Sequence, residues 1–146
     1  MRWKLIGSPD TPTYVVVLDP GDEAMAVLSG FAADQHLSGA QVTAVGAFER
    51  AVIGWFDRRA RDYRPIRVNQ QCEVLSLVGD VALGPQGPQP HIHAVLGLAD
   101  GSTRGGHLIE GQVWPTLEVI IRETRAELRK TYRPDIGLAL IDLDQD

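Results

Sequence analysis

Three of the four histidines in the chain lie close together in the sequence, at His91, His93 and His107. Residues two apart on a β-strand share a face and lie about 6.6–6.8 Å apart along the strand. A strand at this point therefore places the imidazoles of His91 and His93 on one side. Zinc–nitrogen bonds of about 2.0–2.1 Å allow two imidazoles at this spacing to bind one ion. The pattern predicts a metal site.

The position of His107 depends on the turn between two expected strands on either side of Asp100-Gly101. A three-residue loop that ends at Gly101 places His93 directly opposite His107, with Cβ atoms about 4.5–5.5 Å apart. A two-residue turn shifts the register and puts His107 on the other face, unless a bulge restores it. The alternative to a metal site is a cluster of hydrogen-bonded polar side chains.

Two acidic residues are candidates for catalysis beside the histidines, Glu118 and Glu110. Glu118 lies in an apolar run over residues 116–121, where a charge needs a partner or solvent. It can act as a general base, but an ion pair at a sheet edge or an interface is the favoured interpretation. Cys72 belongs to an expected buried strand, which predicts an unreactive thiol. His36 follows a helix and is expected at the surface.

The charged residues are unevenly distributed. The chain has 14 Lys and Arg against 19 Asp and Glu, a net charge of −5. Proteins that bind nucleic acid through overall charge usually have a pI above about 9, which this chain does not approach. Residues 58–67 are nevertheless basic, and residues 122–133 form a second basic stretch. The candidate nucleic-acid contacts in the first stretch are Arg58, Arg59 and Arg61.

Length and composition favour one domain over residues 1–146. At roughly 150 residues a domain buries about 68–70% of its unfolded surface, enough for a core. Hydrophobic residues make up 44% of the chain, too many for a disordered protein. No apolar run approaches the ~20 residues of a membrane-spanning helix, and the start lacks a signal-peptide pattern. A single cysteine indicates a reducing, cytoplasmic setting.

The hydrophobic patterns predict an α+β fold, a largely antiparallel sheet with flanking helices. A helix is expected from Asp22, as its cap, to about His36, before Ser38-Gly39. Residues 58–65 and 84–90 are expected to be loops, and residues 122–132 a helix or a strand. Strands are expected at 14–18, 41–48, 51–56, 72–83, 91–98, 103–109, 117–121 and 136–143.

Several segments together resemble the plants-and-prokaryotes conserved (PPC) domain family, from about the first strand to near residue 121. They are Pro90-His91-Ile92-His93, Asp100-Gly101, Gly105-Gly106-His107-Leu108, the strand 72–79 and the strand 42–48. The resemblance implies an antiparallel sheet flanked by helices, a homotrimer and a metal-binding unit. The family's three histidines correspond to His91, His93 and His107.

The resemblance also implies a DNA-binding or regulatory role. Plant members carry AT-hook motifs, whose Arg-Gly-Arg core contacts the minor groove, but the only Arg-Gly here is Arg104-Gly105. One alternative is a metal-dependent enzyme acting on a small molecule, because three protein ligands leave a fourth zinc position for water. Another is a scaffold trimer in which zinc only stabilises the hairpin. No nucleophile or phosphate-loop motif identifies a reaction.

Overall fold

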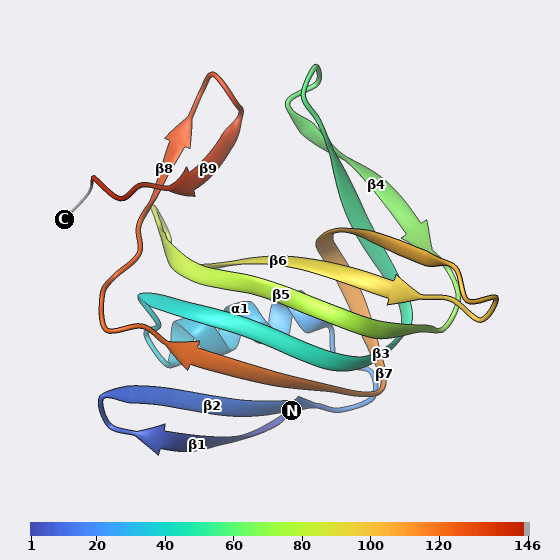
Figure 1. Ribbon diagram of the computed structural model, residues 1–146, viewed down its shortest axis with the longest axis horizontal. Coiled ribbons are helices and arrows are strands. Elements are labelled where there is room, and N and C mark those ends of the chain that lie inside the picture. The colour runs from blue at the N-terminus through green and yellow to red at the C-terminus, as the bar shows by residue number, and fades with distance from the viewer. Residues whose placement is uncertain (145–146) are drawn as a thin grey trace.

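The computed structural model describes residues 1–144 of the chain, which form nine strands and one helix (Figure 1). Their bounds are β1 (Arg2–Ser8), β2 (Thr11–Leu18), α1 (Ala24–Asp34), β3 (Gly39–Asp57), β4 (Asp62–Val68), β5 (Cys72–Gly84), β6 (Gly87–Gly97), β7 (Thr103–Glu123), β8 (Lys130–Arg133) and β9 (Leu138–Ile141).

Seven strands form one antiparallel sheet in the order β1-β2-β7-β6-β5-β3-β4, with an additional pairing between β7 and β3. The two halves of each long strand, β3 and β7, pair with different neighbouring strands. The first half of β3 lies between β5 and the second half of β7, while its second half lies between β4 and the first half of β7. The sheet therefore curls strongly, and the two ends of β7 pair with different neighbours.

Local irregularities produce the bends in β3 and β7. The β3–β7 register shifts between Gly46 and Phe48 and again further along, as expected at β-bulges. Gly46 has a φ of +150°, and a Cβ atom there would overlap the Thr116 carbonyl oxygen. Pro115, which has no N–H to donate, lies in the β7 segment where the ladder is interrupted. Both strands consequently continue through the bends.

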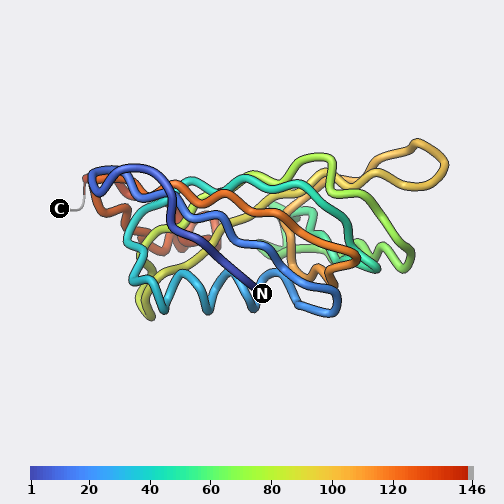
Figure 2. Tube along the Cα trace, turned by 90° about the horizontal axis from the view of Figure 1, so that it is seen from below, coloured from blue at the N-terminus to red at the C-terminus, as the bar shows by residue number. Residues whose placement is uncertain are grey.

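The hydrophobic core lies between the sheet and α1, which covers one sheet face (Figure 2). From α1, Leu28 and Phe31 are buried, and from β6 the alternating residues Ile92, Ala94 and Leu96 point to the same side. Burying each large apolar side chain contributes about 1.5–3 kcal/mol. The other residues of β6, including its histidines, must then face away from the helix.

The helix begins one residue later than expected and is fixed to β7. Glu23, rather than Asp22, is the N-cap, and its carboxylate accepts hydrogen bonds from Met25 N at 3.2 Å and Ala26 N at 2.7 Å. The same carboxylate accepts from Gly111 N at 2.9 Å. Exposed His36 follows the helix in a left-handed conformation, φ +54°.

The prediction of an α+β fold with flanking helices is wrong, because α1, of 11 residues, is the one helix within residues 1–144. Segments expected to interrupt strands instead continue them. The expected strands 41–48 and 51–56 are one continuous strand, β3, and the expected loop 58–65 contains the start of β4. Bulged and bent strands replace breaks, so the fold is dominated by sheet. Within this described part, no helix is long and apolar enough to cross a bilayer.

Two hairpins rise from the same side of the sheet, β3–β4 and the separate two-stranded β8–β9 sheet (Figure 1). Their tips touch, because Arg61 Nη1 donates a hydrogen bond to the Pro134 carbonyl at 3.0 Å. The β8–β9 hairpin is attached to the end of β5 by a 2.7 Å bond from Leu83 N to Leu128 O.

Candidate metal centre

The β6–β7 hairpin places His93 directly opposite His107. Leu98 and Ser102 close the loop with a 2.8 Å hydrogen bond, and Gly101 has a φ of +81°. The Asp100 carboxylate accepts from Ser102 N at 2.9 Å and from its hydroxyl at 2.6 Å, which fixes the turn. Of the two turns considered, the three-residue loop is therefore the one present, and it places His107 on the face that carries His93.

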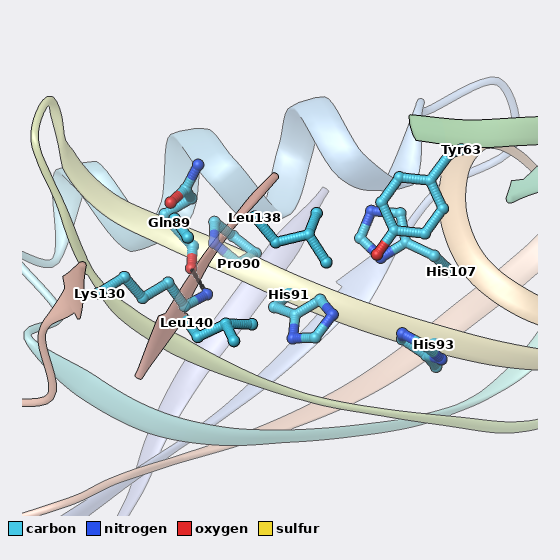
Figure 3. Close-up of a pocket in the computed structure, with 10 residues that line it drawn as sticks. Tyr63, Gln89, Pro90, His91, His93, His107, Lys130, Leu138 and Leu140 are labelled. Carbon is cyan, nitrogen blue, oxygen red and sulfur yellow. Dashed lines mark hydrogen bonds between the residues drawn. The ribbon is translucent and has the colours of Figure 1, made fainter. Parts of the chain in front are cut away.

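The three imidazoles converge on one face of the sheet, opposite α1 (Figure 3). Ring centroids lie 5.1 Å apart for His91–His93, 5.3 Å for His91–His107 and 5.5 Å for His93–His107. One nitrogen of each ring lies within 4.8 Å of the other two. Small side-chain rotations suffice to bring three nitrogens to zinc-binding distance.

The surroundings of His93 and His107 favour neutral imidazoles, the form that binds metals. Burial, followed by the positive charges of His91, His93 and Lys130, lowers the pKa of His107 to about 4. Burial and then the neighbouring His91 lower the pKa of His93. His107 Nδ1 is buried and has no hydrogen-bond partner among the described residues, which is unusual for a buried polar atom. A cation fits this donor set.

Asp80 lies beside His91, and Lys130 forms an ion pair with Asp80. Asp80 lies opposite His91 in the β5–β6 ladder, with Oδ2 3.5 Å from His91 Nδ1. Lys130 Nζ lies 3.3 Å from Asp80 Oδ1, an ion pair without hydrogen-bond alignment, and its side chain is only 4% exposed. A carboxylate beside one ring nitrogen orients the imidazole and leaves the other nitrogen for a metal.

The charge state of Asp80 is set by opposing effects. Desolvation by burial acts to raise the pKa of this carboxyl, but His91 and Lys130 more than offset it, so the pKa lies below its ordinary value. The carboxylate is therefore ionised and already paired with the Lys130 ammonium group.

A cavity of about 410 Å³ opens over the imidazoles, and β4, β6, β7, β8 and β9 all contribute to its wall (Figure 3). Tyr63 stacks on His107, with ring centroids 4.5 Å apart and planes 18° apart. Burial raises the pKa of Tyr63, so its hydroxyl is protonated. The lining residues are Tyr63, Gln89, Pro90, His91, His93, His107, Lys130, Leu138, Ala139 and Leu140.

The other candidate residues lie outside this cavity. Glu118 is exposed on β7 opposite Val45, and exposed Glu110 lies in a separate polar cleft. Cys72 is buried, and desolvation raises the pKa of its thiol, as an unreactive cysteine requires.

The β3–β4 turn presents Arg58, Arg59 and Arg61 to solvent. Buried Asp57 organises this turn, accepting hydrogen bonds from Arg59 N at 2.8 Å and Ala60 N at 3.3 Å. These backbone bonds reduce the pKa of Asp57, opposed by burial and aided by its ion pair with Arg64. The structure therefore gathers the candidate nucleic-acid contacts on one ordered turn, with Arg61 also bonded to Pro134.

Three residues of the site were not predicted from the sequence: Tyr63, Asp80 and Lys130. Asp80 had a detectable signal, since a carboxylate within an otherwise apolar strand requires a partner. Lys130 lies within the basic stretch 122–133 and has no distinctive spacing, and Tyr63 lies in a segment expected to be a loop. Both residues are distant from the histidines in the sequence. They lie beside the histidines only because the β3–β4 and β8–β9 hairpins pack around the cavity.

We expect Lys130→Met to lower the free energy of unfolding by about 1–3 kcal/mol, because it leaves the partly buried Asp80 carboxylate without its cation. The figure is below that of a fully buried pair because Asp80 is 27% exposed. Lys4→Met, at the only other lysine, is the control and should change stability by less than about 0.5 kcal/mol. Urea unfolding measures both, and equal midpoints for the two variants would contradict the assignment.

Comparisons with known proteins support the same architecture. The bifunctional protein GlmU of Synechococcus sp. (strain JA-3-3Ab) is 31% identical over 132 residues, which are 89% of this chain and 20% of that protein. This chain thus spans about a fifth of the length of the curated relatives it matches.

Two solved structures show the same fold. A metal-containing protein from Archaeoglobus fulgidus superimposes with a TM-score of 0.82 and 27% identity, covering 96% of both chains. A protein from Bacteroides thetaiotaomicron, described as a candidate DNA-binding protein, has a TM-score of 0.89 and 20% identity, covering 98% of this chain and 99% of that chain.

The sequence profile of the Plants and Prokaryotes Conserved (PCC) domain, the family that the histidine motifs resemble, matches residues 7–125. This match covers most of the chain, including β2 to β7 and all three histidines. The chain belongs to the Plants and Prokaryotes Conserved domain family.

Proposed function

We propose that this protein binds one divalent cation, zinc, through His91, His93 and His107. The observation that carries the proposal is the convergence of three imidazole nitrogens within 4.8 Å of one another. The unpartnered Nδ1 of His107 and the carboxylate behind His91 support it. Bound zinc with three protein ligands supplies a Lewis-acidic fourth position that is open to water or another ligand.

Elemental analysis of purified protein after dialysis tests the metal centre. We expect about one zinc ion per chain in the wild type and less than about a tenth of that in His93→Ala, which removes one of three ligands. His36→Ala removes an exposed histidine outside the site and is the matched control. Equal metal contents in the wild type and His93→Ala would exclude the site.

We further propose that residues 1–146 form one domain, although residues 145 and 146 lie outside the described residues. We also propose that three copies of the chain assemble through the histidine-bearing face of the sheet. Ile120, Thr43, Val78 and His93 lie in one row across β7, β3, β5 and β6. Exposed apolar surface of this kind marks a protein interface. The apolar members of the face, Val45, Val78, Val95 and Ile120, are 40–58% exposed. Family membership supports the trimer. The proposed location of the protein is the reducing cytoplasm.

Light scattering after size-exclusion chromatography measures the assembly. We expect the wild type to have three times the chain mass of 15.9 kDa. Val78→Glu should shift the mass toward one chain, because an interface buries the new carboxylate without a partner. Ala26→Glu, on the exposed side of α1, is the control and should keep the wild-type mass. A wild type with the mass of one chain would contradict the proposal.

A second proposed function is DNA binding through the β3–β4 turn. Three exposed arginines on an ordered turn suit phosphate contacts, although the chain as a whole is acidic. Family membership and the description of the Bacteroides protein support this role. The chain lacks an Arg-Gly-Arg core, so the contact proposed here uses the turn rather than an AT-hook.

Binding to a short double-stranded oligonucleotide at several salt concentrations tests this function. Replacing Arg58, Arg59 and Arg61 by Ala should weaken binding and reduce the slope of log K against log salt by up to about 3. Replacing exposed Arg2, Lys4 and Arg50 by Ala removes the same charge elsewhere and should leave the slope unchanged. Absent binding, or equal slopes for the two variants, would count against a DNA interface at this turn.

A further inference from the structure

The charges around the histidine cavity are unbalanced once a cation is bound. Three neutral imidazoles leave a divalent ion with its full charge of +2. Among the described residues that line the cavity, none is Asp or Glu. The nearby Asp80 carboxylate lies behind His91 and is already paired with Lys130. The described residues that line the cavity therefore offer no carboxylate to occupy the open metal position.

We propose that the cavity binds a small aliphatic carboxylate, whose carboxylate group occupies the open position on the cation. The inference rests on the proposed metal centre and adds the chemical class of its ligand. An anion is favoured because the partly enclosed site strengthens its attraction to the metal relative to water. A carboxylate fits better than phosphate, because phosphate has more oxygens to satisfy and Lys130, the one cationic side chain among the described lining residues, is already paired with Asp80.

Tyr63 provides a hydrogen-bond donor for the second carboxylate oxygen. Its ring is held against His107 by stacking, and its hydroxyl points into the cavity (Figure 3). A carboxylate that binds the metal with one oxygen can accept the Tyr63 O–H with the other. Hydrogen bonds to a charged acceptor are about twice as strong as neutral ones, so this donor selects carboxylates over neutral alcohols.

The opposite wall of the cavity is apolar and suits an aliphatic chain. Leu138 and Leu140 of β9 and Pro90 of β6 form this wall (Figure 3). The volume of about 410 Å³ is within the roughly 300–1,000 Å³ range of small-molecule sites. A chain of a few carbon atoms fits beside the histidines. Each methylene buried there should raise affinity about fourfold.

The test uses the full chain loaded with Co²⁺, whose visible absorption spectrum reports changes in metal coordination. Acetate, butanoate, butan-1-ol and inorganic phosphate are titrated separately. We expect both carboxylates to change the spectrum, with butanoate, which has two more methylenes, binding up to about sixteenfold more tightly than acetate. Butan-1-ol and phosphate should bind more weakly than butanoate by about tenfold or more.

Three variants separate the head and the tail of the ligand. Tyr63→Phe should weaken acetate and butanoate by about fivefold or more while Co²⁺ uptake stays unchanged. Leu140→Ala should weaken butanoate but not acetate. Tyr132→Phe removes an exposed hydroxyl from the β8–β9 hairpin, which also carries Leu140. It is the control for the Tyr63 and Leu140 variants.

The outcomes distinguish this inference from the metal centre on which it rests. A chain that takes up Co²⁺ but whose spectrum does not respond to either carboxylate overturns the ligand alone. Tighter binding of phosphate or butan-1-ol than of butanoate also overturns it, because the carboxylate or the apolar wall is then not recognised. A chain that takes up no Co²⁺ overturns both the metal centre and the ligand.

Discussion

The pairing of His93 with His107 across the β6–β7 hairpin is the constraint on which the whole site depends. A slip of one residue would exchange His107 with its neighbour Leu108, which is fully buried against the core. The exchange would expose a leucine, at a cost of about 1.5–3 kcal/mol, and bury an imidazole without a partner. Core packing and the Gly101 turn therefore enforce the same register, and the convergence of three histidines follows from it.

The curl of the sheet adds the rest of the cavity to this hairpin. Because β3 bends, its second half and β4 reach the first half of β7, and Tyr63 arrives on the ring of His107. The same β3–β4 hairpin carries the exposed arginines, and its tip bonds to the β8–β9 hairpin through Arg61. The basic turn and the histidine cavity thus share their supporting elements, the β3–β4 and β8–β9 hairpins.

Local chemistry predicted a hairpin and limited its turn to two alternatives, but it did not predict the elements around the hairpin. Asp100-Gly101 and the strand alternation around His93 lie within a few residues, so the turn type alone determined which side chains face each other. The bends in β3 and β7 depend on pairings between distant segments, and the expected breaks at residues 49–50 became bulges. Lys130 and Tyr63 likewise reach the site through tertiary contacts. Flanking helices were wrongly expected, because most segments outside α1 found partners in the sheet.

The ion pair behind His91 links the β8–β9 hairpin to the proposed metal. A lysine close to a divalent cation repels it, yet Lys130 is held by Asp80, whose negative charge offsets that repulsion. Asp80 in turn faces Nδ1 of His91, so the position of this ligand depends on a residue delivered by β8. Linkage is reciprocal: if the attached hairpin increases metal affinity, metal binding stabilises the attached hairpin by the same free energy. Since β9 also forms the apolar wall of the cavity, the same linkage would stabilise the surface that the aliphatic chain contacts.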